Sequence, residues 1–342
     1  MSKTILHVNA HGAPRKAGFP VLIGLFCAAA CGALLSLAMG ARPISVSTIL
    51  SAFVAYDPAE FDHQALFLFR LPRVTAAILV GAALALTGAL MQTVIRNPLA
   101  EPQLLGLNSG AALAVVATSV AGLDAAGIIR PAVAALGAFT AFSVVFALSA
   151  IGRSGATPLK VTLSGVIVSA FASSVTSAFL LIDDQALQDL RLWLAGDLAG
   201  QSMQGQQVAT PIICVAVLAA FLLSPRLSAL ALGDDVARGL GVNVRTTRLA
   251  ALCIAAMLSG ATVTLAGPIG FIGLIVPHLV RRAMGENIRH QFLACLLGGP
   301  LLLLVADMLA RLLIAPAEIA TGVVTGAVGA LFFIILVARH FR

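Results

Sequence analysis

Ten apolar stretches follow one another along the chain, and the short segments between them carry most of its charged residues. Because about 20 residues of α-helix cross a bilayer, stretches of this kind predict transmembrane helices. We therefore expect an all-α polytopic membrane protein with about ten transmembrane helices. The expected spans are residues 18–41, 74–95, 103–121, 131–151, 161–182, 207–224, 249–266, 271–284, 291–312 and 319–338.

The first apolar stretch follows a polar segment that contains Lys3, Arg15 and Lys16. A signal peptide also begins with basic residues, but its apolar region is shorter than the run at 18–41. We therefore expect an N-terminal tail at 1–17 and a single transmembrane domain at 18–342, the first helix of which is not cleaved.

The positions of Lys and Arg predict the orientation. An even number of spans places both termini on one side, and cytoplasmic segments carry an excess of Lys and Arg. With the N-terminus inside, 15 of the 21 Lys and Arg residues fall in inner segments. The tail and both termini are therefore expected to be cytoplasmic.

One charged insert, at about 225–248, interrupts the apolar pattern on the inner side. Asp234 and Asp235 suit the start of a short helix, where carboxylates meet unpaired N–H groups, and Gly239 and Gly241 suit its end. Val236 and Leu240, four residues apart, then share a small apolar face framed by charge. Such a face fits a soluble partner that docks on it, and the alternative is a solvated connector.

Composition agrees with a membrane protein. The 342 residues are 60% hydrophobic and 10% charged, whereas about a quarter of the residues in soluble domains are charged. The net charge of +7 comes from basic residues between apolar stretches, so we expect no nucleic-acid partner. The cysteines lie within the stretches and are expected to be small core residues without disulfide or metal spacing: Cys27, Cys31, Cys214, Cys253 and Cys295.

Most spans have no ionisable side chain in their interior, where ion-coupled transporters usually place them. The exceptions are His278 in the eighth span and, near the outer end of the ninth, Asp307 and Arg311, which are four residues apart and able to pair. Paired carboxylates, Cys/His clusters and phosphate-binding loops are also lacking at a plausible depth. We therefore expect a conduit that is not an enzyme, binds no metal or cofactor and takes its energy from a partner.

Two octapeptides hint at an internal repeat. Gly81-Ala-Ala-Leu-Ala-Leu-Thr-Gly88 and Gly260-Ala-Thr-Val-Thr-Leu-Ala-Gly267 lie on the second and seventh spans. Spans that are five apart cross the membrane in opposite directions, as in an inverted repeat. Chance similarity between segments rich in Gly and Ala is the alternative.

The chain resembles the permease subunits of bacterial ABC importers for iron–siderophore complexes, haem and cobalamin, the FecCD-type family. Many motifs carry the resemblance in order over nearly the whole length. They are Arg70-Leu-Pro-Arg73, Gly81-Ala82, Gly88, Gln92, Arg96-Asn-Pro-Leu-Ala-Glu-Pro102, Leu105-Gly106, Gly110-Ala111, Trp193-Leu-Ala-Gly196, Leu240-Gly241, Gly267-Pro-Ile-Gly-Phe-Ile-Gly-Leu-Ile-Val-Pro-His278, Arg281, Gly285, Ala306-Asp307, Ala310-Arg311 and Glu318.

The resemblance implies a permease domain of the ABC type II importer kind at 18–342, in the bacterial inner membrane. The transport path then lies between two permease subunits, identical or different. Two cytoplasmic ATPases use ATP and Mg, and an extracytoplasmic binding protein delivers the ligand. Ferric siderophore is the first expectation for that ligand, haem and cobalamin come next, and a secondary transporter driven by an ion gradient is the rival from another class.

The resemblance also implies roles for residues. It assigns Arg70, Arg73 and Arg311 to docking of the binding protein, with headgroup or Asp307 pairing as the alternative. The ATPase-coupling residues in the insert are Asp234, Asp235, Ala237, Gly239, Leu240 and Gly241. The expected inner gate consists of Asn97, Pro98 and Leu99, joined by Thr157 from the next inner loop, for which a plain loop is the alternative.

Three departures from the family pattern leave undecided which ligand is carried and whether the last helix is kinked. Glu318-Ile-Ala-Thr-Gly322 replaces the common Glu-Leu-Pro-Val-Gly, Leu331 replaces a Pro, and Asp197 replaces a Ser. A last helix without that proline is expected to be straighter.

Overall fold

A computed structural model describes residues 18–40, 42–123, 129–151, 157–182, 191, 193–315 and 317–340. The predicted cytoplasmic tail at 1–17 lies outside these residues. The helices and helical turns are α1 (Gly18–Ala38), α2 (Val46–Val54), α3 (Phe61–Ala65), the π-turn η1 (Leu66–Arg70), α4 (Leu71–Ile95), the 3₁₀ turn η2 (Pro102–Leu105), α5 (Leu107–Val120), α6 (Ile129–Ala150), α7 (Pro158–Ile182), α9 (Met203–Ala231), α10 (Asp234–Gly239), α11 (Val244–Ala266), α12 (Ile272–Met284), α13 (Ile288–Leu312) and α14 (Thr321–His340).

The all-α membrane fold is confirmed, because each of the ten expected spans falls on one of these helices. Among the described residues, seven helical segments are long and apolar enough to cross a membrane. Of the other three spans, α5 has 14 residues and α12 has 13, so each is about 20 Å long against a hydrocarbon core of about 30 Å, whereas α14 has 20 residues. Short helices of this kind are tolerated where protein covers their ends.

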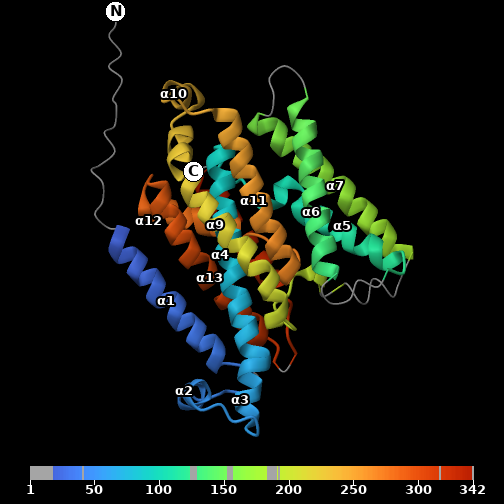
Figure 1. The fold of residues 1–342 in the computed structure, drawn as a ribbon, viewed down its shortest axis with the longest axis vertical. Coiled ribbons are helices and arrows are strands. Elements are labelled where there is room, and N and C mark those ends of the chain that lie inside the picture. The colour runs from blue at the N-terminus through green and yellow to red at the C-terminus, as the bar shows by residue number, and fades with distance from the viewer. Residues whose placement is uncertain are drawn as a thin grey trace, which may run out of the picture.

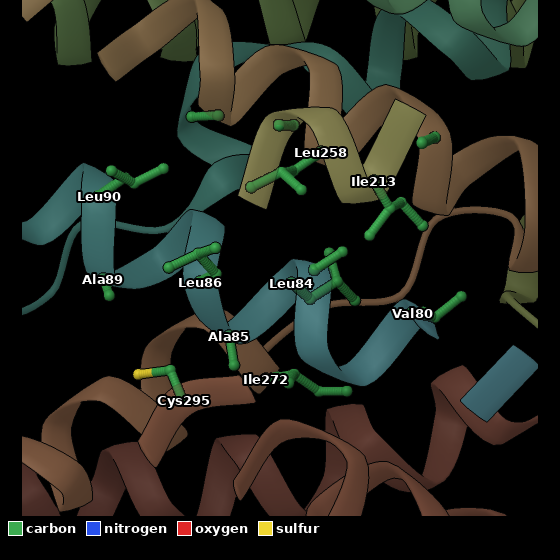
Figure 2. Packing of buried hydrophobic residues seen from close by; sticks show 14 of the residues in the cluster. Val80, Leu84, Ala85, Leu86, Ala89, Leu90, Ile213, Leu258, Ile272 and Cys295 are labelled. Carbon is green, nitrogen blue, oxygen red and sulfur yellow. The ribbon is translucent and has the colours of Figure 1, made fainter. Parts of the chain in front are cut away.

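The helix α4 is the centre of the bundle (Figure 1). Nineteen of its 25 residues are buried, as expected for a helix that is apolar on all sides. Figure 2 shows Leu258 of α11 and Ile213 of α9 on one side of α4, and Ile272 of α12 and Cys295 of α13 on the other. Other helices therefore cover α4 on both sides.

Glycines allow α13 and α12 to approach α4 closely. A Cβ atom at Gly81 would lie 2.6 Å from the Gly299 carbonyl carbon and oxygen on α13. At Gly88 a Cβ would overlap the carbonyl of Gly273 on α12. In a bilayer, where lipid competes for apolar surface, such small-residue contacts are a main source of helix association.

The helices that carry the predicted repeat segments, α4 and α11, lie side by side and run in opposite directions (Figure 1). The glycines of the two segments, however, have different surroundings. Gly260, the counterpart of Gly81, has no atom within 4 Å of the position of a Cβ, and Gly267 has a φ of +67° at the end of α11. The inverted repeat remains a prediction.

The second span and the charged insert differ most from the sequence prediction in their bounds. The second span begins earlier, because α3 and η1 continue into α4 as one helical segment, Phe61–Ile95. The insert at 225–248 is shorter than expected, because α9 continues through Pro225 to Ala231 and α11 begins at Val244. Proline in a membrane helix is tolerated, which explains why Pro225 did not end α9.

The cysteines are only partly the core residues that were expected. Cys295 on α13 is buried, but Cys27, Cys31 and Cys214 are exposed on the outer surface of the bundle. An apolar thiol is equally stable against lipid, so the apolar pattern does not distinguish the two environments.

Candidate functional site

The predicted helix in the insert is confirmed as α10, which lies at one end of the bundle, opposite α2 and α3 (Figure 1). Gly233 (φ +126°) precedes it and Gly241 (φ +77°) follows it, both in conformations that favour glycine. Ala237 is buried against the bundle, whereas Val236 and Leu240 are 47% and 63% exposed. The small apolar face is therefore open.

The two acidic residues at the start of α10 point in different directions. The Asp235 side chain is 99% exposed and pairs only with Arg238 on the same helix, at 2.7 Å. The Asp234 carboxylate instead accepts hydrogen bonds from Arg96 at 2.5 Å and from Arg248 at 3.1 Å. Both acidic residues thus lie in the first turn of α10, as expected, but Asp234 is held there by two cations from other elements.

These partners also favour the charged form of Asp234. Partial burial opposes ionisation of this carboxyl group, but the positive charges of Arg248 and Arg96 together outweigh it and lower the pKa of Asp234. Asp234, Arg96 and Arg248 thus form an ion network of three side chains.

The predicted gate turn lies directly beside this network. Arg96 ends α4 in a left-handed conformation (φ +53°), and its guanidinium also donates to the carbonyl of Leu230 near the end of α9, at 2.6 Å. In the turn that follows, the Asn97 side chain accepts the N–H of Leu99 at 2.9 Å, and Pro98 lies between them. The hydrogen bond of Asn97 thus closes the turn, and the contacts of Arg96, the residue before it, hold the start of the turn in place.

Thr157 lies at the start of α7. Its carbonyl accepts the N–H of Val161 at 3.0 Å, and its hydroxyl accepts the N–H of Lys160 at 3.4 Å, so Thr157 caps this helix. These contacts stay within its own segment, and its predicted place beside the Asn97 turn remains a prediction.

At the opposite end of the bundle, the three predicted docking arginines are engaged within the chain. Arg70 donates to the carbonyls of Leu37 and Ala38 at 2.6 and 3.0 Å, which caps the C-terminus of α1. The docking role of Arg70 remains a prediction.

Arg73 and Arg311 share the buried carboxylate of Asp307. Arg73 donates to Asp307 at 2.9 Å and to the partly exposed Glu318 at 2.7 Å. Arg311 lies 3.1 Å from the other Asp307 oxygen and donates to Ser36 of α1. The pairing of Asp307 with Arg311, predicted because they are four residues apart, is therefore confirmed. This cluster joins α4, α13, α1 and the segment before α14.

Two residues beside the gate turn belong to the family motifs but received no functional role in the sequence prediction. Arg96 and Glu101 flank the gate turn, and the Glu101 carboxylate accepts the N–H of Phe271 at the start of α12. Phe271 has a φ of +68°, unusual for an aromatic residue. The sequence signal for both residues was a charged side chain on each side of the Asn-Pro turn. It did not predict the partners of Arg96 and Glu101, because these partners are distant in sequence.

A cavity of about 910 Å³ opens between α6, α9 and α11. Its walls are mostly apolar and include Phe139, Met257 and the open face of Gly260. None of the predicted gate residues lines it, so it is separate from the turn after α4.

Known proteins are similar to this chain in sequence and in fold. The sequence pattern of the FecCD transport family matches residues 28–339. The iron(3+)-hydroxamate import system permease protein FhuB of Bacillus subtilis (strain 168) is 39% identical over 327 residues, which cover 94% of this chain and 84% of that protein. The ferric enterobactin transport system permease protein FepD of Escherichia coli (strain K12) is 37% identical over 308 residues, 90% of this chain and 92% of that protein.

Two further similarities agree. The hemin transport system permease protein HmuU of Yersinia pestis is 39% identical over 276 residues, 79% of this chain and 82% of that protein. A solved structure, an inward-facing conformation of a metal-chelate type ABC transporter, has a TM-score of 0.83 at 29% identity and covers 94% of this chain and 99% of that one. The permease-like fold expected from the sequence is thereby confirmed, and the chain belongs to the FecCD transport family.

Proposed function

We propose that this chain is the transmembrane permease subunit of an ATP-binding-cassette importer that takes ferric siderophore into the cell. The observation that carries the proposal is α10, a short helix with an open apolar face, displayed at one end of a bundle that belongs to the FecCD family. A helix of this kind fits a cleft on a soluble ATPase, which would supply the energy that the membrane spans themselves have no means to provide.

In this proposal the α10 end is cytoplasmic, as the excess of Lys and Arg in inner segments predicts. The chain spans the bacterial inner membrane several times, with both termini in the cytoplasm. A second permease subunit completes the transport path, two ABC ATPases bind the α10 ends and use ATP and Mg, and an extracytoplasmic binding protein delivers the ligand. The chain itself has no catalytic role.

The proposed cargo rests on relatives whose names refer to iron(3+)-hydroxamate and ferric enterobactin. Haem is the second candidate, because the hemin permease HmuU is as similar in identity, over a smaller share of the chain. Ferric dicitrate permeases are also related, at 36% identity for FecD. The departure at 318–322 lies next to the arginine cluster and not in the gate, so it does not distinguish these cargoes.

Docking of the binding protein at the opposite end is part of the proposal. Glu318 is the partner of Arg73 that solvent can reach, with its side chain 42% exposed. A carboxylate from the binding protein would replace Glu318 on Arg73 and leave the buried Asp307 in place. Such exchange of one exposed ion pair for another costs little and fixes the register of docking.

The test uses proteoliposomes that contain the permease and its ATPase, with ATP trapped inside and loaded binding protein outside. Uptake of ferric siderophore should persist with an uncoupler and stop when ADP replaces ATP. Uptake that collapses with the ion gradient while ATP remains would instead identify a secondary transporter. Repeating the assay with haem-loaded binding protein decides between the two cargoes.

A further inference from the structure

The ion network at the α10 end connects three parts of the chain that are distant in sequence. Asp234 is the first residue of α10, Arg96 follows α4, and Arg248 lies in the second turn of α11. Arg96 also holds the carbonyl of Leu230, so the ends of α4 and α9 and the start of α10 are joined through one guanidinium. A displacement of α10 therefore has to break these contacts or move the end of α4 with it.

We propose that Arg96 and Asp234 are positioning residues that transmit movement of α10 to the gate turn at Asn97, Pro98 and Leu99. This inference rests on the proposed function, because the movement arises from the ATPase that docks on α10. It also divides the acidic pair of the insert. Asp235 faces the partner, whereas Asp234 faces the permease and carries the motion inward.

The geometry makes this link short and stiff. Arg96 is the residue immediately before Asn97, so a shift of its side chain reaches the turn without an intervening flexible segment. Its left-handed backbone is unfavourable for a side chain with a Cβ and is maintained by the contacts on either side. Arg248 supports the network from a position only 11% exposed, where salt screens the interaction less than at an open surface.

The contacts beyond the turn indicate where the motion continues. Four residues after Asn97, the Glu101 carboxylate accepts the N–H of Phe271, the N-cap residue of α12. The ring of Phe271 in turn packs directly on Gly329 of α14. The segment from Arg96 to Glu101 thus joins α10 at one end to α12 and α14 at the other, and the gate turn lies between these two attachments.

The variants Arg96→Ala and Asp234→Asn test the link, and Arg289→Ala is the matched control. Arg289 also lies at the α10 end and donates to α9, at 3.2 Å from the Ser224 hydroxyl, but no hydrogen bond or ion pair joins its side chain to α10 or to the turn in the described structure. Each complex is assayed for ATPase co-purification, for ATP hydrolysis stimulated by loaded binding protein, and for ferric siderophore uptake in proteoliposomes.

We expect both test variants to retain the ATPase and its hydrolysis while the uptake per ATP hydrolysed falls about fivefold or more, which is the lower end of the coupling typical between two sites. Asp234→Glu, which keeps the charge, should recover part of the ratio. Arg289→Ala should keep the ratio of the unmodified chain.

Two results would overturn the link. An unchanged ratio in both variants means that the contacts carry no motion. Loss of ATPase co-purification in Asp234→Asn means that Asp234 contacts the ATPase itself. Failure of the unmodified complex to transport with ATP is a different outcome, which refutes the proposed function and is visible before any variant is compared.

Discussion

The contact between Gly81 of α4 and Gly299 of α13 gives the most direct test of the fold. In Gly81→Ala the new methyl group would lie 2.6 Å from the Gly299 carbonyl and 2.7 Å from the Pro300 nitrogen, whereas real Cβ contacts are at least 3.0 Å. The obstacle is helix backbone, so α4 and α13 have to separate by about 0.4 Å or more along this line. Overpacking of this kind costs about 1–3 kcal/mol.

Gly260→Ala is the matched control, because Gly260 occupies the same place in the second octapeptide. Its methyl group would enter the cavity between α6, α9 and α11, where no atom lies within 4 Å. There we expect no loss and a gain of up to about 1 kcal/mol from a less flexible chain. Thermal unfolding of both variants in detergent, followed by size-exclusion chromatography, measures the difference. A Gly81→Ala protein as stable as Gly260→Ala would refute the close packing of α4 against α13.

Three other predictions follow from single residues. Gly241→Trp introduces bulk and a strained backbone (φ +77°) beside α10, so ATPase co-purification and uptake should fall sharply at normal membrane levels; normal uptake would make the insert a linker. Asp307→Asn leaves the buried Arg311 guanidinium without a carboxylate and Arg73 with Glu318 alone, so it should destabilise the protein by about 3–5 kcal/mol in thermal unfolding, against less than about 1 kcal/mol for Glu318→Gln at the exposed pair. In single-cysteine variants, maleimide should label Cys253, which lines the cavity, and not the buried Cys295; equal labelling would contradict the packing of α13.

The sequence predicted the spans well because the bilayer imposes a strong and simple requirement. A helix that crosses the membrane must be apolar over about 20 residues, whatever it packs against. Helix-capping signals placed α10, since Asp234 and Asp235 begin it and Gly241 follows its end. The span prediction failed at the ends of α4 and α9, because neither a π-turn nor a tolerated proline changes the apolar pattern.

The partners of charged side chains were harder to predict. The pairing of Asp307 with Arg311 was found because both lie on one helix, four residues apart, so the spacing alone brings them together. Arg96 and Asp234 are 138 residues apart, and only the packing of α4 beside α9 makes them neighbours. Periodicity carries no information about such contacts, which is why the acidic pair of α10 was given one role instead of two.

The charges on α4 lie only at its ends. Arg73 joins the first turn of α4 to Asp307 on α13, and Arg96, just after the last turn, joins it to Asp234 on α10. Between them the helix is buried and apolar, and it packs against α9, α11, α12 and α13. Because no ionisable side chain lies between the two ends, α4 offers no charged group to a coupling ion. A permease driven by an external ATPase needs no such group, whereas a transporter that binds its own coupling ion needs charged or polar groups at the midplane.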